Sequence, residues 1–194
     1  MKLSIVLQET YSRTELILRT LFGAFYITLP HAFLLFFLSL WGKVLSFIAF
    51  WVVLFSGRYP ESMFEYQVQL MRWQIRVKAR INNLSDDYPP FGLSAADEHV
   101  NLEVPYPERI SRSVLLLRIL FGVIYVFLPH FFFLFFRMIW GSILLFLAWF
   151  VVLFTKKFPE SWHEFIVGTI RWNTRVTLYL FFMTDTYPPF SSKE

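Results

Sequence analysis

The sequence contains no cysteine, so a disulfide framework, a thiol nucleophile and a thiolate metal site are excluded. Both long apolar stretches, residues 16–55 and 115–154, lack Asp and Glu, which argues against a carboxylate-based ion pathway through them. A glycine-rich phosphate loop and a nucleophile paired with a base are also missing. These absences predict a protein that is not an enzyme and that binds no cofactor or metal.

Apolar residues dominate the amino-acid composition. The 194 residues are 56% hydrophobic and 21% aromatic, with 25 Phe. A soluble protein of this size has too little interior to hide so much apolar surface, so lipid is expected to cover part of it. Each apolar stretch is long enough for two membrane crossings at roughly 20 residues each. Residues 1–9 show no basic segment followed by an apolar core, so internal helices rather than a cleaved signal peptide are expected to drive insertion.

The chain contains one unit of about a hundred residues twice in tandem. Leu29-Pro30-His31 returns 99 positions later as Leu128-Pro129-His130, and 39 of the 80 positions from Ser12 to Phe91 are identical at this shift. The identical positions include Arg19 and Arg118, Trp41-Gly42 and Trp140-Gly141, Arg72-Trp73 and Arg171-Trp172, and Tyr88-Pro89-Pro90-Phe91 and Tyr187-Pro188-Pro189-Phe190.

The predicted fold is an all-α integral membrane protein with two tandem parallel repeats. In each repeat, a hairpin of two transmembrane helices is followed by a cytoplasmic interfacial amphipathic helix and a Pro-Pro tail. Repeat one covers residues 1–91, with the hairpin at about 13–56 and the interfacial helix at about 60–84, and a linker covers residues 92–99. Repeat two covers residues 100–190, with the hairpin at about 112–155 and the interfacial helix at about 159–183, and residues 191–194 form a tail.

Proline and glycine mark the expected bends of each hairpin. Pro30 and Pro129 should kink the first helix, because proline removes one backbone hydrogen bond and clashes with the preceding turn. Trp41-Gly42 is expected at the turn between the helices. The second helix, ending at Phe55, would be about 22 Å long at 1.5 Å per residue, less than a ~30 Å hydrocarbon core. The hairpin is therefore either a short transmembrane pair or a wedge that does not emerge, and spanning is favoured.

The basic residues set the expected orientation. Of 18 Lys and Arg, only Lys43 and Arg137 lie at the expected hairpin turns. The positive-inside rule then places both termini, the linker and both interfacial helices in the cytoplasm. An even number of crossings per repeat makes the repeats parallel, related by an axis along the membrane normal.

His31 and His130 each follow a proline inside an apolar stretch. One hypothesis is that they protonate, bind a metal together or form a proton path near the axis between the repeats. The favoured hypothesis is structural: each imidazole bonds the backbone carbonyl that Pro30 or Pro129 leaves unpaired. Two histidines without a nearby carboxylate or cysteine are a poor set of metal ligands.

Four charged residues share one face of each interfacial helix, because they are spaced 4, 7 and 4 residues apart. They are Glu61, Glu65, Arg72 and Arg76 in repeat one, and Glu160, Glu164, Arg171 and Arg175 in repeat two. The arginines, with Trp73 and Trp172 beside them, are predicted to contact lipid phosphates or acidic groups of a partner. The alternative is that acids and arginines pair and hold the cytoplasmic layer together. Nucleic acid is not expected as a ligand beside two membrane hairpins.

The other repeated features are expected to be structural. Residues 1–10 and 101–108 are predicted to be extended arms that pair with each other or dock on a partner, with a loosely held polar lead-in equally compatible. Arg19 and Arg118 are expected to reach the membrane interface, with pairing to Glu61 or Glu160 as the alternative. The Tyr-Pro-Pro-Phe tails are expected to pack on aromatic residues of their own repeat, and docking into a partner groove is the alternative.

The pattern Leu-Pro-His … Arg-Trp … Tyr-Pro-Pro-Phe resembles a family of small bacterial membrane proteins catalogued only as a domain of unknown function. The resemblance covers nearly the whole chain, once per repeat, and is most specific around Arg171-Trp172, Arg175-Val176 and the segment from Tyr187 to Phe190. It implies a bacterial inner-membrane location and supplies no activity.

These patterns predict a non-enzymatic membrane subunit or scaffold. It would bind membrane lipids, through anionic headgroups, and other integral membrane proteins, and a homo-oligomer is compatible with this role. One alternative is a lipid-handling or transport component with a site between the two repeats. The other is a bilayer-shaping hairpin protein.

Overall fold

The computed structural model describes residues 1–193 as a mostly helical protein built from two repeats. In copy one, α1 (Arg13–Gly23), a π-helical turn η1 (Ala24–Thr28) and α2 (Leu29–Ser56) form one long helix, and α3 (Glu61–Ile81) follows. In copy two, α4 (Arg112–Gly122), η2 (Val123–Phe127) and α5 (Leu128–Thr155) form the second long helix, and α6 (Glu160–Leu180) follows. Strands β1 (Lys2–Ile5) and β2 (Val100–Glu103) each precede a long helix.

The hairpin prediction is wrong, because each long helix continues through its Trp-Gly pair. Gly42 lies where α2 approaches α3 closely: a Cβ atom on Gly42 would be 3.1 Å from a methyl carbon of Leu70. Gln67 also donates from Nε2 to the Gly42 carbonyl at 2.6 Å. A glycine inside a helix costs only about 1 kcal/mol relative to alanine. Close packing against α3 is therefore a sufficient reason for the glycine, and no turn is needed to explain it.

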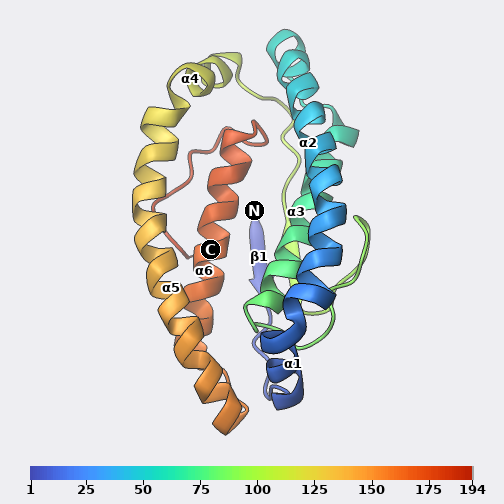
Figure 1. Ribbon diagram of the computed structural model, residues 1–194. Coiled ribbons are helices and arrows are strands. Elements are labelled where there is room, and N and C mark those ends of the chain that lie inside the picture. The colour runs from blue at the N-terminus through green and yellow to red at the C-terminus, as the bar shows by residue number, and fades with distance from the viewer. Residues whose placement is uncertain (194) are drawn as a thin grey trace.

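Each long helix bends near its proline, as expected. The bend is a π-helical turn that ends two residues before the proline. The Leu29 N–H bonds the carbonyl of Ala24, five residues earlier. Pro30 lacks the N–H that an α-helix would direct to the Tyr26 carbonyl, and Tyr88 donates its hydroxyl to that carbonyl at 2.9 Å instead. The same bond, also at 2.9 Å, joins the corresponding tyrosines in copy two. Figure 1 shows the result for α4, which turns away from the axis of α5 across one end of the molecule.

The two copies run in opposite directions, so the prediction of parallel repeats is wrong. α2 rises in Figure 1 while α5 descends. Each long helix begins against the end of the other, where an arginine bonds one of its last carbonyls: Arg13 bonds Phe154 at 2.7 Å, and Arg112 bonds Phe55 at 2.6 Å. A positive charge is favourable at a helix C-terminus. Reciprocal capping of this kind requires antiparallel helices.

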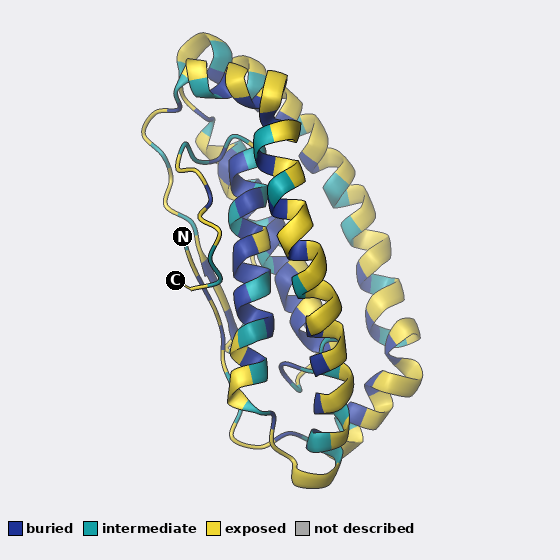
Figure 2. Ribbon diagram, turned by 90° about the vertical axis from the view of Figure 1, so that its left-hand side faces the viewer, coloured by how far each residue is buried: buried dark blue, intermediate teal, exposed yellow. Residues whose placement is uncertain are grey.

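The elements form three layers. Strands β1 and β2 pair antiparallel, as the arm prediction allowed, with Lys2 opposite Glu103. The sheet turns Leu3 and Leu102 inward and exposes Lys2 and Glu103. In Figure 2, the buried helices α3 and α6 lie between this sheet, with both termini on its side, and the largely exposed long helices. Contacts of α3 with both α2 and β2, and of α6 with both α5 and β1, agree with this order.

The outer layer presents an apolar face. Most of the large exposed apolar side chains belong to the two long helices, and many are Phe, such as Phe25, Phe36 and Phe55 in copy one. Each long helix has 44 residues and is long and apolar enough to cross a membrane, and its most apolar part is mostly exposed. The protein interior therefore does not account for this apolar surface.

A buried arginine paired with a partly exposed aspartate fixes the start of each long helix to the tail after the third helix. Arg19 bonds Asp86 at 3.0 Å and also bonds the backbone carbonyls of Arg80, Ser85 and Asp86. Asp86 in turn accepts the backbone N–H of Ser12, the N-cap of α1, at 2.7 Å. Arg118, Asp185 and Ser111 repeat the arrangement in copy two. Both arginines are buried, so the expectation that they reach the membrane interface is wrong.

We expect Asp86→Asn to lower the free energy of unfolding by about 3 kcal/mol, because it leaves the buried Arg19 guanidinium without a countercharge. The matched control is Glu65→Gln, which breaks the exposed Arg72–Glu65 pair at 3.3 Å and should cost less than about 1 kcal/mol. Thermal and denaturant unfolding in a mild detergent, followed by circular dichroism, measures both. Equal losses in the two variants would contradict this account of the Arg19–Asp86 pair.

Candidate functional site

The two proline-linked histidines are enclosed by aromatic side chains of their own copy. His31 accepts a hydrogen bond at Nδ1 from the Trp73 indole at 2.9 Å, which places its proton on Nε2. Phe91 of the tail stacks on the imidazole with ring centroids 4.0 Å apart. His130, Trp172 and Phe190 repeat this set at 2.9 and 4.1 Å. The tail prediction is confirmed, since Phe91 and Phe190 also contact the tryptophans edge to face.

The predicted hydrogen bond from each histidine to the carbonyl left unpaired by proline is not formed. The carbonyls that Pro30 and Pro129 leave unpaired are bonded by tyrosine hydroxyls, and neither histidine bonds them. Both histidines are fully buried, and the Nε2 atom of each has no hydrogen-bond partner. Each belongs to the aromatic cluster of its own copy, and this geometry does not show a shared metal site.

The arginines predicted to touch lipid hold the sheet instead. Arg72 donates from Nε to the Leu102 carbonyl at 2.9 Å, and Arg171 donates to the Leu3 carbonyl at 3.2 Å. Each therefore binds the strand that precedes the other copy. Arg171 also pairs with Glu164 at 3.0 Å, as Arg72 does with Glu65, which is the pairing that the alternative interpretation predicted.

The tryptophans beside the arginines and the first acidic residue of each third helix also have positions that stabilise the fold. Trp73 and Trp172 are buried, so they are not interfacial anchors. Glu61 and Glu160 lie in the first turns of α3 and α6, where the helix dipole favours a negative charge. The charged residues lie on one face of each helix as predicted, and the arginines on that face bond the sheet, the linker and the tail.

In copy one, the linker is bound to a defined surface, here named the linker site. Arg76 donates to the carbonyls of Gly92 and Ala95. Arg80 and Asp97 form a buried ion pair at 2.8 Å, and His99 bonds Asp87 at 2.9 Å. The acidic residues Asp97 and Glu98 inside the linker are the one sequence signal for this contact, and composition alone predicts only a polar connection between the copies.

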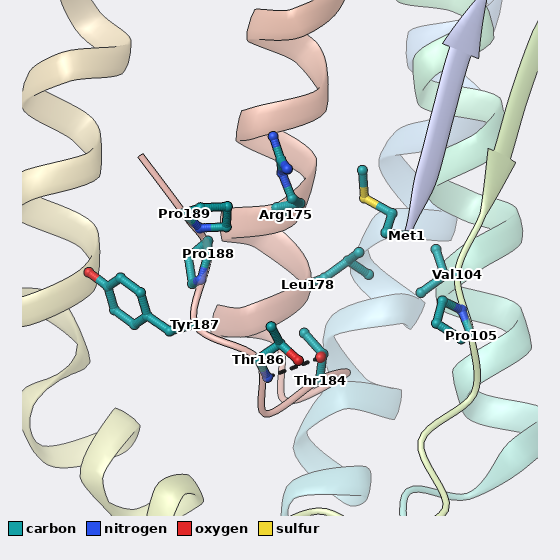
Figure 3. A pocket seen from close by; sticks show the side chains of 10 residues that line it. All are labelled: Met1, Val104, Pro105, Arg175, Leu178, Thr184, Thr186, Tyr187, Pro188 and Pro189. Atoms are coloured by element: carbon teal, nitrogen blue, oxygen red, sulfur yellow. Dashed lines mark hydrogen bonds between the residues drawn. The ribbon is translucent and has the colours of Figure 1, made fainter. Parts of the chain in front are cut away.

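The corresponding surface of copy two is a cavity of about 160 Å³, here named the open site (Figure 3). Its walls come from α6, the tail after it, and the residues that flank the two strands. The lining residues are Met1, Val104, Pro105, Arg175, Leu178, Thr184, Thr186, Tyr187, Pro188 and Pro189. Arg175 bonds Ser191 at 2.6 Å, as Arg76 bonds Gly92, and Thr186 stands where copy one has Asp87. The open site therefore corresponds in position to the linker site, and among the described residues it is a cavity.

The tail of copy two crosses α6 at Gly168. A Cβ atom there would lie 2.8 Å from the Cβ of Ser192, so only glycine lets the tail approach this closely. The tail then passes beside Arg171, whose Nη1 donates to the Ser192 carbonyl at 2.8 Å. Both contacts hold residues 190–192 against α6 at the edge of the open site.

Comparison with known protein families agrees with the two-copy architecture. The chain matches the family described as a domain of unknown function, DUF4389, over residues 13–92 and again over residues 112–192. No curated protein and no solved structure matches the chain. The two matches begin at or next to the first residue of each long helix and end just after each Tyr-Pro-Pro-Phe tail. The protein therefore belongs to this family and contains its domain twice in tandem.

Proposed function

We propose that this protein is a non-enzymatic membrane scaffold that lies along one leaflet of the bacterial inner membrane, with its apolar face in the hydrocarbon. The observation that carries the proposal is the separation of its two faces. Exposed Phe, Leu and Trp side chains cover the long helices, while the opposite face presents the polar side of the sheet. A contiguous apolar surface of this extent is typical of a lipid or protein contact. Lipid is the favoured occupant, because the apolar surface continues along both helices.

An in-plane orientation explains the length of the helices better than crossing does. The parts after the bend, α2 and α5, have 28 residues each and would measure about 42 Å at 1.5 Å per residue, which exceeds the ~30 Å hydrocarbon core. Crossing would also place the exposed charges of the sheet, Lys2 and Glu103, at membrane depth, where charged groups are costly. Lying in the interface avoids both problems.

The basic residues also favour the in-plane orientation. One end of the molecule carries Arg13 beside Lys156 and Lys157, and the other carries Arg112 beside Arg109 and Arg58. A crossing orientation would put equal numbers of these cations on both sides of the membrane, against the positive-inside rule. In the plane, both ends lie at headgroup depth on one side. The cytoplasmic leaflet, with its anionic lipids, is the favoured side for these ends and for both termini.

The open site supports the scaffold part of the proposal. Its counterpart in copy one binds an extended segment through arginine-to-carbonyl bonds, so an extended segment of a partner protein is the occupant that fits. The lining is more apolar than that of the linker site, since Leu178 and Thr186 replace Ala79 and Asp87. An uncharged segment is therefore favoured.

The orientation is tested with Arg58→Cys and Lys157→Cys, made separately in this cysteine-free chain. The two positions correspond across the repeats and lie at opposite ends of the molecule. In-plane insertion predicts that a membrane-impermeant maleimide labels both from the same side, in cells and in inside-out vesicles. Labelling from opposite sides would show that the helices cross the membrane and would overturn the proposal.

The partner site is tested with an environment-sensitive fluorophore on Thr186→Cys and, as the matched control, on Asp87→Cys. The probe is a synthetic peptide with capped ends and the linker sequence of residues 92–96, which carries no charged side chain. We expect a saturable change in fluorescence at position 186, because the open site is accessible, and at least a threefold smaller change at position 87, where the linker is already bound. No response at position 186, or equal responses at both, would contradict a peptide site.

A further inference from the structure

A slot between the two copies contains two basic side chains that the proposed scaffold role leaves unexplained. It consists of two adjoining cavities of about 190 and 200 Å³ that share Lys78 and Ile170. The first lies between α3 and α6, and the second between these helices and α5. The polar residues in the two linings are Gln74, Lys78, Asn82, Arg137, Ser142, Thr169, Asn173, Thr174 and Thr177.

The slot is positively charged and has no acidic residue in either lining. Arg137 is held by Thr169 and the Phe165 carbonyl, both at 3.2 Å, and its guanidinium lies 4.1 Å from the centre of the Phe165 ring. Lys78 lines both cavities but is exposed, and it forms no hydrogen bond or ion pair with the described residues. The protein packed around it lowers the pKa of its ammonium group by desolvation. A bound anion would offset that desolvation by attraction to both cations.

The position of the slot suits a lipid headgroup. Met138 and Ser142 line it and are also exposed on the apolar outer layer, so the slot opens toward that layer. A lipid under an in-plane protein has its headgroup directed toward the polar layers and its acyl chains toward the bilayer centre. The headgroup would then enter the slot, and the chains would lie along the exposed Phe side chains of α5. Each cavity is smaller than the roughly 300 Å³ at which ordinary ligand pockets begin, so it fits a phosphate group and not a whole lipid.

The second cavity exists in only one of its two pseudo-equivalent places, whereas the first lies across both copies and is lined by corresponding residues such as Lys78 and Thr177. The residues that correspond to Arg137 and Lys78 are Leu38 and Thr177. Gln67 corresponds to Ile166 of the slot, and its side chain reaches Gly42 and Ser46 at 2.6 and 3.0 Å. The amide thus occupies the position that is open in copy two, and one anion per chain is expected.

We propose that Lys78 and Arg137 bind the phosphate of one anionic phospholipid within this slot. The inference rests on the proposed insertion in one leaflet, because a lipid can present its headgroup there only if the apolar layer is in the hydrocarbon. Free phosphate has the same chemistry and is distinguished by the experiment.

The test is native mass spectrometry of the protein released from nanodiscs of phosphatidylglycerol or phosphatidylcholine with the same acyl chains. The wild-type chain should retain one phosphatidylglycerol, with at least tenfold preference over phosphatidylcholine. The double variant Lys78→Gln/Arg137→Gln and the single variant Ser142→Asp should each lose this preference. Ser142 is exposed, so the added carboxylate tests the charge of the slot while Lys78 and Arg137 stay in place. Lys43→Gln, an exposed cation outside both linings, is the control and should retain the lipid.

Vesicle flotation of the same variants separates this inference from the proposed function. Unchanged flotation with loss of the bound lipid in the slot variants supports the headgroup site. Equal retention by the slot variants and Lys43→Gln would overturn it while leaving membrane insertion intact. Displacement of the lipid by an equimolar amount of inorganic phosphate would overturn the lipid as the source of the anion. Failure of every variant and of the wild type to float would reject the proposed function itself.

Discussion

The structure depends on one constraint: two helices of 44 residues carry more apolar surface than the rest of the chain covers. The third helices pack against only one side of them, and this leaves the other side to the surroundings. The polar strands and tails then collect on the far side of α3 and α6, which gives the molecule one apolar face and one polar face. A body with this division fits a bilayer surface better than either water or the full thickness of the membrane.

The polar side is held together mainly by arginines that bond backbone carbonyls. Arg19 and Arg118 fix the long helices to the tails, and Arg72 and Arg171 hold strands that precede the other copy. Each copy thus supplies hydrogen-bond donors to the strand that precedes the other copy. Each copy also caps the C-terminal end of the other copy's long helix. A single copy would lack the arginines that bond the Leu3, Leu102, Phe55 and Phe154 carbonyls from the opposite copy, which is a physical reason for two copies of the domain in one chain.

Much of the architecture could be predicted from the sequence, because it depends on local signals. The repeat and the third helices follow from residue identity and spacing, and the pairing of the arms was one of the predicted alternatives. The continuous long helix could not be predicted in this way, because Gly42 fits a turn and a close helix contact equally well until the position of α3 is known. The direction of the copies depends on contacts across the molecule, such as Arg13 with Phe154, that spacing within one copy does not reveal.

The candidate sites were harder to predict for the same reason. Arginines on one face of a helix indicate an anion or a carbonyl, and only the fold decides between them. Asp86 gave a usable signal, since both copies keep an aspartate two residues before Tyr-Pro-Pro-Phe. Lys78 and Arg137 gave none, because each occurs in only one copy, and they approach the same slot from different helices.

The most direct test of the central claim is the depth of α2 in the bilayer. Nitroxide labels at Phe33, Leu40 and Phe47, all exposed, would sample 14 residues or about 21 Å of the helix. Depth is measured by the accessibility of each label to oxygen and to a water-soluble nickel complex. An in-plane helix predicts the same depth at all three positions to within about 5 Å, which is a fraction of one ~15 Å leaflet. Depths that differ by about 10 Å or more along the helix would contradict the account, because they would show that α2 crosses the bilayer.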